Sequence, residues 1–179
     1  MKRLISVFLA VLVTSASVAK ATHPADLVVA QVRSHGAEAA VKDIWSHPAK
    51  VRQLLRGVGR GDGRWLRAGE ALIPGADAGA AEDLEGAFAD ALLIRPYAVL
   101  PWLQPHWWSD DPLQTCVFGW DSELPGGVRR YVEVLRQALS HPAPPGLESL
   151  RGNCLRGISV TLRSLSASSG EPTDAAQRH

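Results

Sequence analysis

The sequence predicts an all-α protein, a small irregular helical bundle with one disulfide. Apolar residues recur at helical spacing through most of the chain, and the alternation of β-branched residues that is typical of strands is nearly absent. Proline and glycine interrupt the helical stretches at short intervals. The length suits a single domain over residues 22–165, between an N-terminal signal and a disordered tail over residues 166–179.

The first 21 residues have the composition of an export signal. Lys2 and Arg3 precede ten apolar or small residues, and residues 17–19 or 19–21 offer a cleavage site. The apolar stretch is too short to span a bilayer, so we expect a periplasmic or secreted protein without a membrane span. Loss of Lys2, Arg3 and Lys20 from the 19 basic residues leaves 16 against 18 acidic ones, a balance that argues against a nucleic-acid partner.

The N-terminal third is predicted to hold three helices. Pro24 opens the first, which breaks near Gly36, and a short helical segment follows over residues 37–45. Residues 46–48 start the third helix, with Ser46 as a candidate N-cap and Pro48 early in the first turn, where a missing N–H costs little. A run of alternate glycines ends this helix, whose apolar face follows i, i+3, i+4 and i+7 spacing: Val51, Leu54, Leu55 and Val58.

Two more helices are predicted before residue 95. The first surrounds Trp65 and stops at Pro74, and Gly69 is expected to permit a close helix contact. Asp77, in the turn that follows, is a candidate N-cap for the second. The buried stripe of that second helix comprises Leu84, Phe88, Ala91 and Leu92.

The rest of the chain contains one pattern that suggests a repeat. Pro96 is predicted to open another short helix, and residues 95–103 echo residues 47–55 at an offset close to the period of HEAT repeats. Two copies are too few to establish a solenoid, so we predict a bundle with a HEAT-like pseudo-repeat. Helical spacing predicts two final helices over residues 127–139 and 146–165.

The two cysteines, Cys116 and Cys154, both lie in the exported part of the chain. Oxidising conditions there make a disulfide the expected outcome. The chain-entropy model gives a link across such a loop about 4 kcal/mol of stabilisation. Zinc is the competing interpretation, but two thiolates without histidines in ligand spacing make a poor site, so we expect no metal and no cofactor.

The stretch over residues 104–126 is long for a connection and rich in aromatic and acidic residues. Indole faces suit stacking on a sugar ring or a partner side chain, and carboxylates accept hydrogen bonds. The alternative is that the rings cover the open end of the bundle. The candidate binding residues in this stretch are Trp107, Trp108, Trp120, Asp110 and Asp111.

The same stretch offers a weak pattern for catalysis. His106 beside Asp110 or Asp111 has the residue types of a base and its orienting carboxylate, but no local signature marks a nucleophile. Glycosidic cleavage needs two carboxylates at a set distance, and spacing within a loop predicts no distance for Asp121 or Glu123. We therefore assign no catalytic residue.

Charges of opposite sign occupy neighbouring segments. Residues 50–67 carry six basic residues against one acidic residue, and residues 70–90 carry six acidic residues and no basic one. Arg52, Arg56 and Arg60 follow i+4 spacing and share a face if the helix extends that far. Arg52 and Arg56 are therefore candidate binding residues for an anionic ligand or an acidic protein. The alternatives are a solvated face or pairing with the adjacent acidic helix.

Four features together carry a resemblance: residues 63–66, the turn over 74–79, the segment over 82–92, and the late cysteine pair. Over residues 40–155 the chain resembles small exported bacterial helical proteins of unassigned function. The resemblance implies a helical fold and carries over no catalytic or binding residue.

These observations predict a non-catalytic periplasmic protein that acts through contacts with a protein partner, as an inhibitor, immunity factor or accessory factor. Helical faces, an aromatic segment and charge segregation are present, whereas convergent reactive groups are absent from the sequence pattern. Binding of a small ligand or a cell-wall glycan through residues 104–126 is the alternative, and hydrolysis is the third hypothesis.

Overall fold

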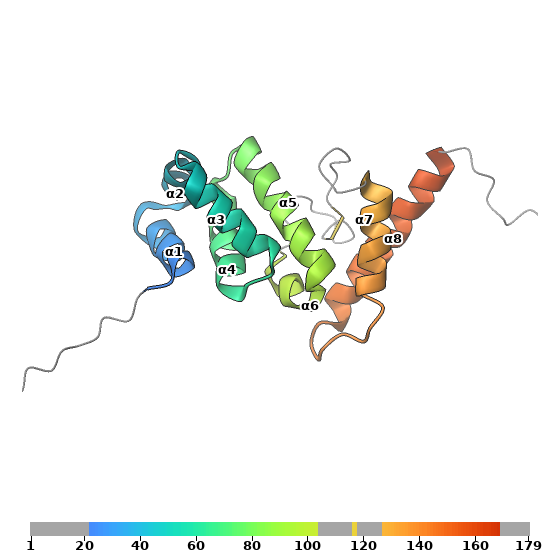
Figure 1. Cartoon of the computed structure of the whole chain (residues 1–179). Coiled ribbons are helices and arrows are strands. Elements are labelled where there is room, and N and C mark those ends of the chain that lie inside the picture. The colour runs from blue at the N-terminus through green and yellow to red at the C-terminus, as the bar shows by residue number, and fades with distance from the viewer. Residues whose placement is uncertain (1–21, 104–115, 118–126, 169–179) are drawn as a thin grey trace, which may run out of the picture.

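A computed structural model of the chain describes residues 22–103, 116–117 and 127–168 (Figure 1). Every regular element in these ranges is helical, which confirms the predicted all-α fold. None of the helices in the described ranges is both long enough and apolar enough to cross a membrane. The predicted signal over residues 1–21 lies outside the described residues.

The elements follow one another with short connections up to Trp102. The α-helices are α1 (Pro24–His35), α2 (Ala37–Trp45), α3 (Pro48–Gly59), α4 (Gly63–Leu72), α5 (Ala78–Ile94), α6 (Pro96–Val99), α7 (Gly127–Ala138) and α8 (Glu148–Ser168). Two 3-10 turns join them, η1 (Ile73–Gly75) and η2 (Leu100–Trp102).

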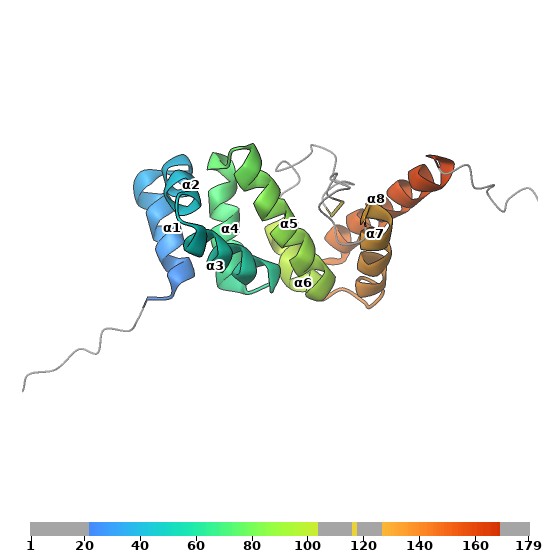
Figure 2. The same ribbon diagram turned by 45° about the horizontal axis from the view of Figure 1, so that its top comes forward.

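The helices form an elongated bundle with one continuous core. α1 and α8 lie at opposite ends in both views, and α5 lies between the N-terminal helices and the α7–α8 pair (Figures 1 and 2). α3 and α4 contact each other, α4 packs on α1, α3 packs on α5, and α5 contacts α7. The buried residues of all these helices join in a single cluster that runs from Ala25 to Ile158.

Two glycines allow the helices around α4 to approach closely. A Cβ at Gly57 of α3 would lie 2.2 Å from Cγ of Trp65, so the indole packs directly on the helix backbone. A Cβ at Gly69 would lie 3.1 Å from Val58 and 3.2 Å from Phe88. The predicted close contact at Gly69 is therefore confirmed, and it joins α3, α4 and α5.

The turn between α3 and α4 has the geometry of a Schellman motif. Gly61 has φ +66°, its N–H donates to the carbonyl of Val58 at 2.7 Å, and the N–H of Asp62 donates to the carbonyl of Gly57 at 3.4 Å. The Asp62 carboxylate then accepts from the N–H of Arg64 at 2.9 Å and caps α4. The predicted end of α3 in the glycine run is confirmed.

One predicted cap is confirmed and one is wrong. Asp77 accepts a hydrogen bond from the N–H of Ala80 at 2.9 Å, as expected for the N-cap of α5. Ser46 is instead the C-cap of α2, and the residue before Pro48, His47, is the N-cap of α3. The physical reason is that proline disfavours the α region for the residue before it, so His47 is held in extended geometry.

The pseudo-repeat is only partly seen in the structure. Pro48 and Pro96 both stand at the first position of a helix, but α3 has 12 residues and α6 has four before the chain tightens into η2. Pro101 lies inside the second copy, within η2, where a longer α-helix would need its N–H. The fold is therefore described as a bundle.

The last helix is longer than predicted. α8 ends at Ser168, three residues inside the predicted tail, and the hydroxyl of Ser166 donates to the carbonyl of Leu162 at 3.0 Å. This hydrogen bond back to the preceding turn is one that serines can make within a helix. Residues 169–179 lie outside the described residues.

The predicted disulfide between Cys116 and Cys154 is confirmed, with Cα atoms 5.3 Å apart and both residues buried. The hydroxyl of the buried Tyr131 in α7 donates to the carbonyl of Cys116 at 3.1 Å. Burial, with a smaller contribution from the charge of Asp90, raises the pKa of Tyr131, so the phenol remains a neutral donor. Residue 116 is thus fixed to both C-terminal helices.

Candidate functional site

The aromatic stretch contributes little to the described part of the chain. Five predicted binding residues lie outside the described residues, Trp107, Trp108, Asp110, Asp111 and Trp120, as do His106, Asp121 and Glu123. Within this stretch the structure describes Cys116 and Val117. The glycan-binding and hydrolase hypotheses therefore stay predictions.

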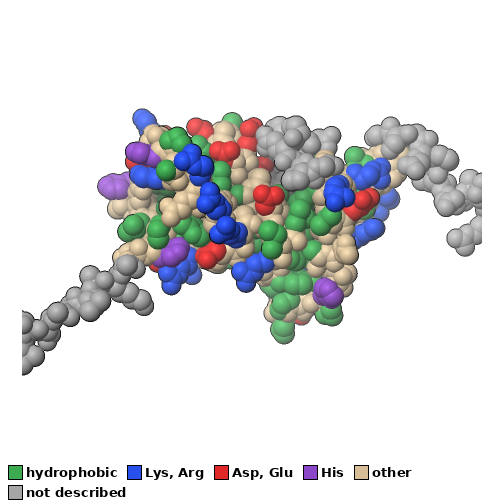
Figure 3. Space-filling model, in the orientation of Figure 1, with side chains coloured by type: hydrophobic (Ala, Val, Ile, Leu, Met, Phe, Trp, Pro, Cys, Tyr) green, Lys and Arg blue, Asp and Glu red, His purple; other side chains and the backbone are tan. Residues whose placement is uncertain are grey.

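The predicted arginine face is present on α3. The helix runs to Gly59, and Arg60 follows it in helical geometry, so three arginines occupy successive turns of one face. Arg52, Arg56 and Arg60 are all exposed. In the space-filling view a diagonal run of basic side chains crosses the molecule over α3, with acidic side chains near the start of α5 (Figure 3).

The three arginines border a groove of about 290 Å³ between α3, the start of α1 and the start of α4. Its other walls include His23, Gln53 and Trp65. His23 is fixed in place by two contacts. Its Nδ1 accepts a hydrogen bond from the N–H of Ala25 at 3.2 Å, and its ring packs edge-on against the Trp65 ring, with the ring centres 5.6 Å apart. We call this feature the arginine groove.

Other basic residues in the region already have partners. Lys50 pairs with Asp43 at 2.8 Å, Arg64 with Asp26 at 3.7 Å, and the guanidinium of Arg67 lies 5.8 Å from the centre of the Trp102 ring.

For the three groove arginines, no carboxylate of the described residues lies within ion-pair distance. Pairing with the acidic helix, one of the predicted alternatives, is therefore not seen within the described part of the chain. Like charges one turn apart destabilise a helix by about 0.2–0.5 kcal/mol per pair, a cost that an anion bound between them relieves.

Three acidic residues of α5 share a second groove with Arg56. Glu82, Asp83 and Asp90 line this groove, and partial desolvation raises the pKa of Asp90. Asp83 accepts a hydrogen bond from Nε1 of Trp45 at 2.9 Å and so ties α5 to α2. This carboxylate has a structural role.

An apolar pocket of about 340 Å³ adjoins the arginine groove. Pro24, Gln53 and Trp65 line both hollows, so the two share a border. Ile44 and Leu54, each 1% exposed, belong to the pocket's buried lining, whereas Leu27 is 55% exposed and Val28 is half-buried.

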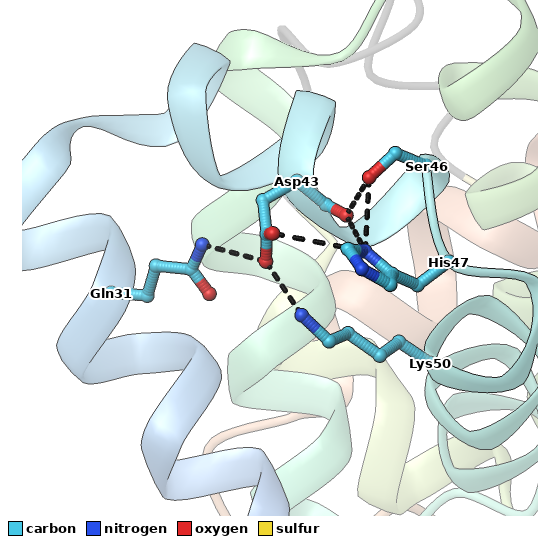
Figure 4. Close-up of polar contacts among 5 residues, drawn as sticks. All are labelled: Gln31, Asp43, Ser46, His47 and Lys50. Atoms are coloured by element: carbon cyan, nitrogen blue, oxygen red, sulfur yellow. Dashed lines mark hydrogen bonds and ion pairs between the residues drawn. The ribbon is translucent and has the colours of Figure 1, made fainter.

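A network of polar side chains holds the rim of this region (Figure 4). The Asp43 carboxylate accepts from Lys50 at 2.8 Å and from Gln31 at 3.1 Å, which joins α2 to α3 and to α1. These hydrogen bonds hold the pKa of Asp43 below its usual range. His47 Nδ1 lies 2.7 Å from the backbone carbonyl of Asp43, and Ser46 donates to the same carbonyl at 2.7 Å.

Sequence patterns identified the arginines but missed the rest of the site. His23 and Gln53 carry no periodic or motif signal, and the pocket is formed by α1, which the sequence does not place beside α3. The adjacent pair Leu27 and Val28 was the available signal, because two neighbouring apolar residues widen the apolar face of a helix beyond one stripe.

Among the described residues no group of three or more His, Cys, Asp or Glu side chains is arranged to hold a metal ion. No protein-family model, no curated protein and no solved structure matches the chain. The site is therefore interpreted from its own chemistry.

Proposed function

We propose that this chain is an exported, non-catalytic binding protein whose arginine groove docks an acidic segment of a partner protein, as an inhibitor, immunity factor or accessory factor does. The observation that carries the proposal is the row of three exposed arginines on α3 that no described carboxylate neutralises. Guanidinium groups bind carboxylates through paired N–H donors, so such a row favours an acidic partner.

Two features support an extracytoplasmic location. The Cys116–Cys154 disulfide is buried, and such bonds persist in oxidising compartments. The N-terminal composition is that of an export signal. An acidic partner in that compartment is attracted over about 10 Å at moderate ionic strength, which raises the association rate as well as the affinity.

Affinity capture with charge-reversal variants tests this function. The mature protein is used as bait in an envelope extract prepared without reductant, next to Arg52→Glu/Arg56→Glu/Arg60→Glu, and bound proteins are identified by mass spectrometry. We expect an acidic partner that the wild-type protein retains, that the reversed variant loses, and that elutes with salt.

The matched control reverses three exposed arginines on α7, Arg129, Arg130 and Arg136. This variant has the same net charge as the first, so general electrostatic repulsion affects both equally. Absence of any partner above background contradicts the proposal, and so does a partner that both variants lose or both retain.

A further inference from the structure

The arginine groove and the apolar pocket are two parts of one surface. Trp65, which is 8% exposed, lines both hollows together with Pro24 and Gln53. A ligand that occupies one hollow therefore reaches the other without leaving the surface. A partner that contacted only the arginines would lie next to the pocket without filling it. The exposed Leu27 side chain and the apolar lining of the pocket would then make no contact with the partner.

The pocket has the size and chemistry for one large apolar side chain. Its volume of about 340 Å³ is well above the ~150 Å³ of a dry cavity that accepts benzene. Leu27, Val28, Ile44 and Leu54 supply aliphatic lining from three helices. Lys50, the charged residue on its border, forms an ion pair with Asp43, so its charge already has a partner within the protein.

The spacing of the arginines matches an extended chain. Residues four apart on a helix rise by about 6 Å along its axis. Alternate residues of an extended peptide are about 6.6 Å apart and point to the same side. Acidic residues at every second position of an extended segment therefore fall opposite Arg52, Arg56 and Arg60 in turn.

We infer that the two hollows together bind an extended acidic peptide segment of the partner that carries one large apolar residue, with the apolar side chain in the pocket and alternate carboxylates along the arginines. The inference rests on the proposed function and specifies the partner's docking segment. The pocket borders residues 50–54 of α3, through Lys50, Gln53 and Leu54, so the apolar residue lies at the Arg52 end of the acidic run.

Synthetic peptides test this arrangement on the full mature protein. The probes have the sequence Leu-Ser-Asp-Ser-Asp-Ser-Asp, its reverse, and versions in which serine replaces the leucine or replaces the aspartates. Binding is followed at low salt by amide chemical shifts, which report both the Kd and the residues contacted. We expect one direction of the leucine peptide to bind about tenfold more tightly than its serine version and to shift signals of α1 and α3.

Two pairs of variants assign the effect. Leu27→Gln, at an exposed position of the pocket wall, should abolish the tenfold preference for leucine, whereas Ile94→Gln, at a similarly exposed apolar position of α5, should keep it. Replacement of the three groove arginines by glutamine should weaken the binding of both aspartate-containing peptides, the leucine and the serine version, about tenfold. The same change at Arg129, Arg130 and Arg136 should not weaken it.

Each other outcome is decisive. Equal binding of the leucine and serine peptides that still depends on the arginines overturns this inference and leaves the proposed function standing. Binding that survives loss of the aspartates, or self-association that broadens α1 and α3 signals without peptide, shows an apolar-only site or a second copy on this face and also overturns it. No binding by any peptide contradicts both proposals.

Discussion

Position 57 leaves room for a hydrogen atom and nothing larger. Trp65 covers Gly57 so closely that an added Cβ would overlap the indole ring, and the same ring lines both hollows of the candidate site. The shape of the site therefore depends on the absence of one methyl group. A glycine in a helix interior costs about 1 kcal/mol relative to alanine, and here that cost is offset by the packing of a nearly buried tryptophan.

We predict that Gly57→Ala lowers the free energy of unfolding by about 1–3 kcal/mol, because the overlap with Trp65 outweighs the gain in helix propensity. Urea unfolding followed by circular dichroism measures the change. Gly86→Ala in α5 is the control, since a Cβ there meets no atom within 4 Å, and it should stabilise the protein by up to about 1 kcal/mol. Equal effects of the two substitutions would contradict the packing described for Trp65.

A second residue-scale prediction concerns the Asp43 carboxylate. Its pKa is lowered in the folded protein by hydrogen bonds from Lys50 and Gln31, so its contribution to stability is present above the unfolded-state pKa of about 3.9 and is lost as the pH falls through the lower folded-state value. Asp43→Asn should be less stable than the wild-type protein at neutral pH, and the difference should shrink below about pH 4. Chemical unfolding of both proteins from pH 7 to pH 2.5 measures this difference in stability. A difference that does not change with pH would show that the charge of the Asp43 carboxylate is not its cause.

At the scale of elements, the chain crosses itself where η1 meets the start of α2. A Cβ at Gly75 would lie 2.1 Å from the backbone nitrogen of Glu38 and 2.3 Å from the carbonyl carbon of Ala37. Backbone atoms on both sides cannot move as a side chain can. This crossing fixes α2, and with it Asp43, relative to α4 and the pocket.

Gly75→Ala should therefore destabilise the protein more than Gly57→Ala does, because the clash is with backbone and not with a ring that can rotate. Thermal unfolding compares the two variants. Gly79→Ala, where the nearest atom to a Cβ is 3.9 Å away, should leave the melting temperature unchanged or raise it slightly. A Gly75→Ala protein as stable as the wild type would show that α2 and η1 are not in this contact.

The disulfide ties residue 116 to α8. It closes a loop across 38 positions, and removal of such a link typically costs about 2–4 kcal/mol. We predict that Cys116→Ser/Cys154→Ser loses this amount of stability and that reductant destabilises the wild-type protein but not the double variant. Free thiols in material purified from the native envelope without reductant would contradict both the bond and the proposed location.

The sequence predicted the presence of the helices better than it predicted their exact ends or which helices pack together. Helical spacing located each helix, and the proline and glycine positions set most boundaries, because those residues act on their own backbone. The cap of α3 was misplaced at Ser46 because side-chain preference was weighed above the restriction that Pro48 imposes on His47. Arg52 and Arg56 could be identified because i+4 spacing is local. The pocket could not, since it needs α1 beside α3 and α4, a long-range arrangement that no local pattern encodes.

The whole molecule is elongated, yet its buried residues form one cluster. The cluster continues from α1 through α5 into α7 and α8, and Leu135 of α7 is fully buried within it. An array of separate repeats unfolds in stages, whereas a shared core unfolds as one unit. The position of α5, in contact with both α3 and α7, makes the second behaviour the expected one.

We therefore predict that a destabilising substitution in the C-terminal helices also lowers the stability of the N-terminal helices. Leu135→Ala removes buried methyl groups from α7 and should lower the free energy of unfolding by about 2–5 kcal/mol. Because unfolding is cooperative, hydrogen exchange of the most protected amides in α3 should accelerate by the same factor as in α7. Exchange measured by mass spectrometry on peptides from both helices tests this. Faster exchange confined to α7 and α8 would mean that the C-terminal pair unfolds alone and that the arginine groove is held by α1 to α5 without it.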